Sequence, residues 1–296
     1  MNDNTINRAG FVNIIGNPNV GKSTLMNRLV GEKLSIVTAK AQTTRHRIMG
    51  IINGEDYQIV FSDTPGILKP KYMLQQSMMQ FVETAIGDAD IILYVTDVVE
   101  KSDKNREYIE RLQRAVSPII LIINKIDLTD QLGLEKLVEM WHTLLPKAEI
   151  IPASAKTGFN IDNLLAKVVE LLPHQHAWYD RDVFTDKSLR FFASEIIREK
   201  ILLNYRKEIP YCTEVVIESF KEEEIYRIEA VINVMRESQK GIIIGPEGLA
   251  LKRVGIQARK DMEKFFNKKV FLKMFVKVDP AWRENRKELK RFGYIC

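Results

Sequence analysis

The sequence predicts a doubly wound α/β domain followed by a smaller α+β domain. Residues 11–15 and 119–123 are apolar runs typical of buried strands, and each ends in a polar loop. Beyond about residue 172 the expected order changes to helix, two strands, two helices and a strand. With 296 residues and 45% hydrophobic content, the chain is long enough for two packed cores.

The run 11–15 leads into a loop with the pattern G-x-x-x-x-G-K-S, which is typical of phosphate-binding loops. Its residues are Gly16, Asn17, Pro18, Asn19, Val20, Gly21, Lys22, Ser23 and Thr24. Backbone N–H groups of such a loop surround the α- and β-phosphates at the start of the following helix. We expect Lys22 to reach the β- and γ-phosphates and the Ser23 hydroxyl to bind Mg²⁺. The segment therefore predicts a nucleotide site.

The next expected strand, residues 58–62, ends in a second phosphate-facing segment. Its members are Asp63, Thr64, Pro65 and Gly66. We expect Asp63 to hold Mg²⁺ through water and the Gly66 N–H to bond the γ-phosphate. The residue that follows is Ile67, where Ras-like switches carry a water-orienting glutamine. Slow intrinsic hydrolysis is expected, because an apolar side chain can neither donate nor accept a hydrogen bond.

The polar stretch 42–45 precedes this strand and holds two adjacent threonines, Thr43 and Thr44. A threonine here can bind Mg²⁺ only while the γ-phosphate is present, which would make the stretch a switch that hydrolysis releases. We favour Thr44 as the ligand and keep Thr43 as the alternative. Asn19 has two interpretations as well: it helps to bind K⁺ beside the phosphates, or it only hydrogen-bonds its own loop.

Residues after the strand 119–123 select the base. Asn124, Lys125 and Asp127 form an N-K-x-D motif at the carboxyl end of the strand, where ligands of open α/β sheets bind. The Asp127 carboxylate can accept two hydrogen bonds from guanine, and adenine would leave it unpaired. We expect Asn124 to tie the strand to the phosphate loop and the Lys125 stem to cover the base. Backbone N–H groups of a further loop are expected at guanine O6; its residues are Ser154, Ala155 and Lys156.

The second domain follows a segment without periodicity. We expect a nucleotide domain over 1–175, a linker over 176–187 and a second domain over 188–296. The expected elements are a helix at 189–202, a hairpin of strands at 214–220 and 226–235, a helix ending near 266 and a strand at 270–278. A G-x-x-G turn, Gly245 to Gly248, lies between the two middle helices, which is the order of a type II KH domain.

A KH domain predicts binding of single-stranded nucleic acid. The residues expected at RNA are Gly241, Ile243, Ile244, Gly245, Gly248, Lys252, Arg253 and Arg259. Charge agrees, because residues 241–296 hold 14 Lys and Arg against 6 Asp and Glu, whereas the net charge of the whole chain is only +5. Trp282 and the basic residues after it have two interpretations, contact with RNA or packing on the KH domain.

One nucleotide domain with these motifs, followed by a KH domain, resembles the Era family of bacterial GTPases. The tail at 277–294 and the run 42–47 also match, so the resemblance covers about residues 10–294. It implies GTP hydrolysis, binding at the 3′ end of small-subunit ribosomal RNA, a role in small ribosomal subunit assembly, and peripheral attachment to the inner membrane. Pro246 and Glu247 depart from the family pattern, which usually has a basic residue in this loop. A carboxylate at this position is expected to repel the phosphates of RNA.

The remaining composition favours a cytoplasmic monomer. Residues 1–8 are polar and show no signal peptide, and no apolar stretch approaches the ~18 residues of a membrane span. The two cysteines, Cys212 and Cys296, form no disulfide framework. Two other functions stay open: a GTP-sensing scaffold with negligible turnover, which Ile67 favours, and a tRNA-modifying or tandem-domain GTPase, which would need features that this chain lacks.

Overall fold

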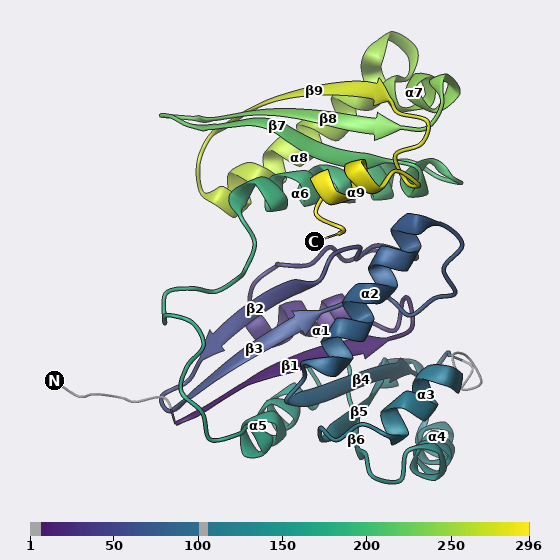
Figure 1. The fold of residues 1–296 in the computed structure, drawn as a ribbon, viewed down its shortest axis with the longest axis vertical. Coiled ribbons are helices and arrows are strands. Elements are labelled where there is room, and N and C mark those ends of the chain that lie inside the picture. The colour runs from purple at the N-terminus through teal and green to yellow at the C-terminus, as the bar shows by residue number, and fades with distance from the viewer. Residues whose placement is uncertain (1–6, 101–105, 296) are drawn as a thin grey trace, which may run out of the picture. The chain divides into compact units, whose positions relative to one another are not determined.

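The computed structural model describes residues 7–100 and 106–295, which fall into two units with separate sheets (Figure 1). The first unit holds most of the chain up to Asp186. The second holds the chain from Lys187 onward together with the short segments 36–43 and 72–74. The polar N-terminal residues 1–6 and Cys296, both considered above, lie outside the described residues.

A six-stranded sheet forms the centre of the first unit, in the order β2-β3-β1-β4-β5-β6. Its strands are β1 (Arg8–Gly16), β2 (Ile48–Asn53), β3 (Tyr57–Asp63), β4 (Ile91–Asp97), β5 (Ile119–Asn124) and β6 (Glu149–Pro152). Only the β2–β3 pair among them is antiparallel. Every residue of β4 and β5 is buried, as expected for central strands that helices cover on both faces.

Helices cover both faces of this sheet, which confirms the doubly wound architecture. They are α1 (Lys22–Val30), α2 (Met73–Gly87), α3 (Arg106–Gln113), the 3₁₀ turn η1 (Ile126–Leu128), α4 (Gln131–Leu144) and α5 (Ile161–Leu171). In Figure 1, α2 and α3 lie on the near face of the sheet and α1 lies on the far face. The register pairs Ile14 with Asp63 and Gly16 with Val95, so the carboxyl ends of β1, β3 and β4 lie side by side.

The segment expected as a linker is hydrogen-bonded to the edge of the first unit. The buried Gln58 side chain accepts from the backbone N–H groups of Trp178 and Tyr179 at 2.8 and 3.0 Å and donates to the Tyr179 carbonyl at 2.8 Å. The Ile51 N–H donates to the Phe184 carbonyl at 2.9 Å. These bonds attach residues 178–184 to β2 and β3, so this part of the segment is not a free spacer.

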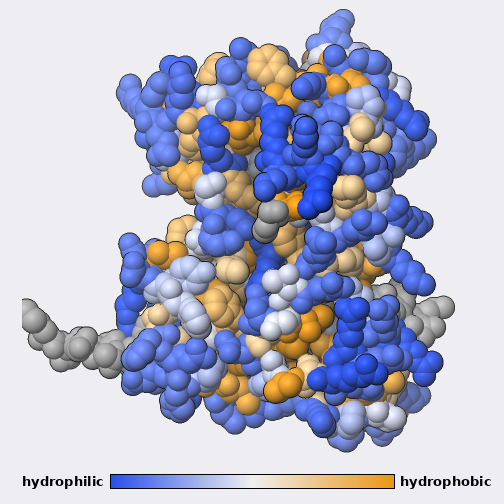
Figure 2. Space-filling view, viewed as in Figure 1, coloured by the Kyte–Doolittle hydropathy of each residue, from blue (hydrophilic) through white to orange (hydrophobic). Residues whose placement is uncertain are grey.

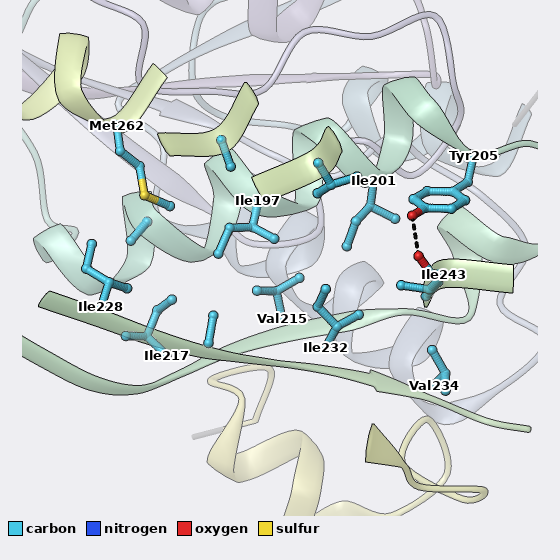
Figure 3. Close-up of a cluster of buried hydrophobic side chains, with 14 of the residues drawn as sticks. Ile197, Ile201, Tyr205, Val215, Ile217, Ile228, Ile232, Val234, Ile243 and Met262 are labelled. Carbon is cyan, nitrogen blue, oxygen red and sulfur yellow. Dashed lines mark hydrogen bonds between the residues drawn. The ribbon is translucent and has the colours of Figure 1, made fainter. Parts of the chain in front are cut away.

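The second unit has the predicted order of elements, with one more helix at its end. Its members are α6 (Leu189–Asn204), η2 (Ile209–Tyr211), β7 (Glu214–Glu222), β8 (Tyr226–Val234), α7 (Glu237–Ile244), η3 (Pro246–Gly248), α8 (Leu249–Phe266), β9 (Val270–Val278) and α9 (Arg286–Arg291). The sheet order is β7-β8-β9, with β7 antiparallel and β9 parallel to β8. Its core lies between this sheet and the helices α6 and α8, where Ile197, Val215 and Ile232 meet (Figure 3).

The face of the molecule drawn in Figure 2 is mostly hydrophilic, with hydrophobic residues between the hydrophilic ones. Across residues 7–100 and 106–295, no helix has the length and apolar character needed to cross a membrane. Trp282 is fully buried in the second unit, and its indole N–H donates to the Cys212 carbonyl at 3.2 Å. The packing interpretation of Trp282 is therefore the correct one.

Candidate functional site

The predicted nucleotide motifs meet at one edge of the first unit's sheet. Each motif begins where a parallel strand ends: β1 at Gly16, β3 at Asp63, β5 at Asn124 and β6 at Pro152. Because carboxyl ends of parallel strands share an edge, segments more than 100 residues apart become neighbours. The edge is therefore the place where a nucleotide would contact all four motifs.

The phosphate loop is held closed by its own lysine. Lys22 is buried, and its Nζ donates to the carbonyls of Gly16 and Asn17 at 3.1 and 2.8 Å. Burial lowers the pKa of Lys22 to about 8, although the charges of Asp63 and Glu100 oppose this shift. The ammonium group thus lies within the loop, and a phosphate would supply the counter-charge that burial makes valuable.

Ser23, Thr44 and Asp63 come together into one cluster of oxygen atoms. The Ser23 hydroxyl donates to Asp63 Oδ2 at 2.7 Å and lies 2.8 Å from the Thr44 hydroxyl, which donates to the same carboxylate oxygen at 3.2 Å. Burial raises the pKa of Asp63. Among the described residues, its second oxygen, Oδ1, is buried and has no hydrogen-bond partner. Hard oxygen donors with an unsatisfied carboxylate oxygen fit a Mg²⁺ ion, which prefers such ligands.

The two adjacent threonines differ in their surroundings. The Thr43 hydroxyl bonds within its own segment, to the Thr38 hydroxyl and the Lys40 carbonyl, each at 2.6 Å. Only Thr44 contacts Ser23 and Asp63. This geometry favours Thr44 over Thr43 as the residue that senses the metal and the γ-phosphate.

The segment after β3 lies directly against the phosphate loop. A Cβ added to Gly66 would lie 2.7 Å from the Pro18 Cα, so a side chain there would collide with the loop backbone. The Thr64 hydroxyl donates to the Ile14 carbonyl at 2.8 Å and anchors the segment to β1. Ile67 is only 2% exposed, and its N–H donates to the Gly16 carbonyl at 3.1 Å. Its side chain is therefore a buried anchor and does not face solvent beside the phosphates.

Asn124 links the base-reading motif to the phosphate loop. Its amide donates to the Val20 carbonyl at 2.8 Å and accepts from the Ala155 N–H at 3.0 Å. A Cβ on Gly21 would lie 2.2 Å from the Asn124 Nδ2, so the loop can pass the amide only as glycine. One side chain thus joins three separate motifs, as the sequence predicts for its contact with the phosphate loop.

The other two members of the motif are also held in place. Lys125 Nζ donates to the Asn19 carbonyl at 2.6 Å and pairs with Asp97 at 2.5 Å. The exposed Asp127 carboxylate accepts from the Ser154 hydroxyl at 2.7 Å, which orients one oxygen and leaves the other for a ligand. Lys156 is exposed beside them.

Two acidic residues at this edge did not follow from the sequence. Asp97, at the end of β4, fixes Lys125 as described. Glu100 accepts a hydrogen bond from the Asn17 amide and another, at 3.1 Å, from the Thr96 hydroxyl. No motif marks either residue, and the only signal was their position just after a buried strand of a parallel sheet.

Asn19 takes a backbone conformation that presents its side chain outward. Its φ is 67°, in the left-handed region that asparagine tolerates, and the residue is exposed. Within the described part of the chain, its side chain makes no hydrogen bond. The interpretation that Asn19 only bonds its own loop therefore has no support in the structure.

The predicted RNA site in the second unit is built on the G-x-x-G turn. Gly245 has φ 70°, and a Cβ there would lie 2.6 Å from that of Ala250. Gly248 has φ 74°, and Glu247 between them has φ 51° and is exposed. The turn thus requires glycine at its first position, and it exposes the Glu247 side chain.

Most of the predicted RNA-binding residues are accessible, with one correction. Lys252, Arg253 and Arg259 are exposed on α8, and Gly241 is exposed on α7. Ile243 is 0% exposed, so the prediction that its side chain contacts RNA is wrong; it packs in the core, and its carbonyl accepts from the Tyr205 hydroxyl (Figure 3). The neighbouring Ile244 is half-buried.

Exposed apolar side chains flank the turn and were missed. Ile242, Leu249 and Ile256 are 49%, 57% and 48% exposed on α7 and α8. Leu249 and Ile256 are seven residues apart and so lie on one face of α8. Apolar side chains beside a glycine turn suit the flat faces of unpaired bases.

Similar proteins share both units. Residues 11–125 match the family model described as a 50S ribosome-binding GTPase, and residues 208–283 match that of the KH domain. The chain is 45% identical to GTPase Era of Geobacter metallireducens over 298 aligned positions, covering 99% of this chain and 100% of that protein. It is 46% identical to GTPase Era of Syntrophus aciditrophicus, covering 97% of this chain and 95% of that protein.

Two crystal structures are similar over nearly the full length. One is a variant of Era from Aquifex aeolicus bound to GDP·AlF₄⁻, with a TM-score of 0.94, 38% identity, and coverage of 98% of this chain and 100% of that chain. The other is Era in complex with MgGDPNP and nucleotides 1506–1542 of 16S ribosomal RNA. Its TM-score is 0.94 at 38% identity, covering 98% and 99% of the two chains.

Proposed function

Because the chain belongs to the GTPase Era family, we propose that it is a GTP-hydrolysing switch that binds the 3′ end of small-subunit ribosomal RNA. It acts in assembly of the small ribosomal subunit. The observation that carries the proposal is the contact of Ser23, Thr44 and Asp63, which joins the phosphate loop, the switch threonine and the segment after β3. A nucleotide that orders Thr44 would therefore also fix Asp63 and the Gly66 N–H.

The proposed site has a division of labour. Lys22 and the backbone of residues 16–24 bind the phosphates, Gly66 donates to the γ-phosphate, and Asp127 binds guanine. Ser23, Thr44 and, through water, Asp63 would hold Mg²⁺, which when bound neutralises charge on the phosphate oxygens. Intrinsic GTP hydrolysis is slow in this proposal, because the Ile67 side chain is buried and cannot orient the attacking water.

RNA binding belongs to the second unit in this proposal. Gly245 and Gly248 let the RNA backbone approach, while Lys252, Arg253 and Arg259 supply positive charge. The apolar residues beside the turn would contact bases. Glu247 weakens the grip of the turn without abolishing it, since it is exposed and screened by solvent ions.

Organisation and location are part of the proposal. We retain a nucleotide domain at 1–175, a linker at 176–187 and a KH domain at 188–296. We place the protein as a monomer in the cytoplasm, with peripheral attachment to the inner membrane. The buried Cys212 thiol, which donates to the Ile209 carbonyl at 3.3 Å, is compatible with a reducing compartment, and co-sedimentation with anionic vesicles would test the attachment.

The test is RNA binding as a function of nucleotide. A fluorescent RNA matching the 3′ end of small-subunit ribosomal RNA is titrated with protein loaded with Mg²⁺ and either GDP or a non-hydrolysable GTP analogue, at one fixed salt concentration. Tight, sequence-selective binding with the GTP analogue alone is expected, and Lys22→Ala should abolish the nucleotide dependence. Equal binding in both states would contradict the switch, and no binding in either state would contradict RNA recognition. Multiple-turnover GTP hydrolysis, measured in parallel, separates an enzyme from a scaffold.

A further inference from the structure

The outer face of the second unit's sheet carries exposed aromatic rings that the sites above do not use. β9 is the last strand in the sheet order and pairs with β8. Val270, Leu272 and Met274 of β9 pack with the core beneath α8, so the alternate residues point to the opposite face. These residues, which we call the β9 stripe, are Phe271, Lys273, Phe275 and Lys277, all of them exposed.

Both phenylalanine rings remain about half exposed to solvent, although each has a cation beside it. Phe271 is 49% exposed, with the Arg227 guanidinium 5.7 Å from the centre of its ring. Phe275 is 45% exposed, with Lys273 Nζ at 4.8 Å from its ring centre. Two half-exposed rings on one face of one strand form an apolar surface that a ligand could cover. The neighbouring cations also put positive charge where a polyanion would lie.

We propose that the β9 stripe is a second RNA-binding surface, on which single-stranded bases stack. Aromatic rings alternating with lysines combine what such binding requires: flat apolar faces for bases and cations for phosphates. Phe271 and Phe275 are four residues apart on a strand, a separation of about 13 Å. Lys273 lies between them and Lys277 beyond, so phosphates that link the stacked bases meet a cation at each step.

A protein strand fits this edge less well. Lysine at every second position is a device by which edge strands resist pairing with another chain. An apolar partner lying on the two rings would also have to remove water from Lys273, whose carboxylate neighbour Glu229 is 3.7 Å away and about half exposed. A polyanion avoids this cost, because its phosphates replace the water around the ammonium groups.

The stripe lies on the other side of the sheet from the G-x-x-G turn. The turn joins α7 and α8, and α8 packs on the core face of the sheet through Val254, Ala258 and Met262. Met262 is labelled in Figure 3. The inference rests on the proposed RNA-binding function and extends it. An RNA longer than the segment bound at the turn would pass the β9 edge and reach the second face.

The test uses the full-length protein and two fluorescent RNAs, of which the short one is a segment of the long one. The short RNA has about six nucleotides, enough for the groove of a KH domain, and the long RNA about 20. Phe271→Leu combined with Phe275→Leu keeps apolar surface but removes both rings. We expect the affinity for the long RNA to fall about tenfold and that for the short RNA to change less than about twofold. Phe184→Leu, an equally exposed phenylalanine (49%) of the first unit, is the matched control.

A second variant tests the same surface through charge. Lys277→Gln should lower the salt dependence of long-RNA binding by about 0.7 in the logarithmic slope, the value for one lost phosphate contact on a single strand. If the double variant binds the long RNA as tightly as the wild-type protein does, the inference is wrong. It is also wrong if the double variant loses self-association, measured by sedimentation, without any change in RNA binding, because the stripe would then be a contact between copies of the chain. If the wild-type protein binds neither RNA, the proposed function fails and this inference fails with it.

Discussion

A buried polar network in the first unit offers a quantitative test of the structure. The Arg47 guanidinium donates to the Ser62 hydroxyl at 2.6 Å, to Asn13 Oδ1 at 3.1 Å and to both Asp88 oxygens at 2.6 and 3.0 Å. The Asn13 amide in turn donates to the Ala85 carbonyl at 2.6 Å. The network joins β1, β3 and the end of α2 to a residue three positions after Thr44.

Replacing Arg47 with methionine keeps the side chain's length and removes all of these donors. Asn13 and Ser62 are 0% exposed and each lose a partner, which costs about 1–3 kcal/mol per buried group. The Asp88 side chain is 44% exposed, so solvent screens its lost ion pair to less than about 1 kcal/mol. Arg47→Met should therefore lower the opening free energy of the first unit by about 2–7 kcal/mol, the sum of these contributions.

Native-state hydrogen exchange of amides in β1 and β3 is the suitable assay, because a chain with two units does not unfold in one transition. The control is Arg111→Met, which removes two ion pairs to the exposed Glu83 and Glu107. We expect it to change the free energy by less than about 0.5 kcal/mol. If Arg47→Met costs no more than this control, the argument from buried donors is wrong.

Three further predictions concern the two binding sites. Asp127→Asn should weaken GTP binding at least about 100-fold. The variant should instead bind xanthosine triphosphate, because the C2 carbonyl of xanthine can accept a hydrogen bond from the new amide. Displacement of fluorescent GDP measures the affinity for both nucleotides. Thr44→Ala should raise the Mg²⁺ concentration needed for binding of a non-hydrolysable GTP analogue by about tenfold, whereas equal effects of Thr44→Ala and Thr43→Ala would contradict the assignment. Glu247→Lys should strengthen RNA binding several-fold and steepen its salt dependence, while Glu224→Lys, an equal charge change on the hairpin turn, should do less.

Much of the fold could be predicted because its strands are either buried runs or regular alternations. β5 matches its apolar run, and β9 matches the predicted range 270–278. β2 and β4 were missed, although residues 91–95 are as apolar as β5. A short apolar run does not by itself distinguish a strand from a buried helix, and these two runs end in no recognised motif.

The site residues that belong to a sequence motif could be predicted. The site residues that are placed only by contacts between distant segments could not. Glu100 meets Asn17 from 83 residues away, and no local pattern encodes that distance. Asp97 and Arg47 also act through partners outside their own element, 15 to 41 residues away along the chain. Ile243 was misassigned for a related reason: three consecutive isoleucines precede the turn, and only the orientation of α7 decides which one enters the core.

The N-K-x-D motif, which we expect to read the base, is bonded directly to the phosphate loop. Lys125 binds the Asn19 carbonyl, and Asn124 binds the Val20 carbonyl, so the base-reading motif holds the phosphate loop at two successive residues. The exposed Asn19 side chain projects from this fixed stretch. Because the Ile67 side chain is buried, the polar groups that could position an attacking water include the loop itself and the Gly66 N–H. A guanine seated on Asp127 would thereby also help to position the phosphate loop, which would couple specificity for the base to hydrolysis.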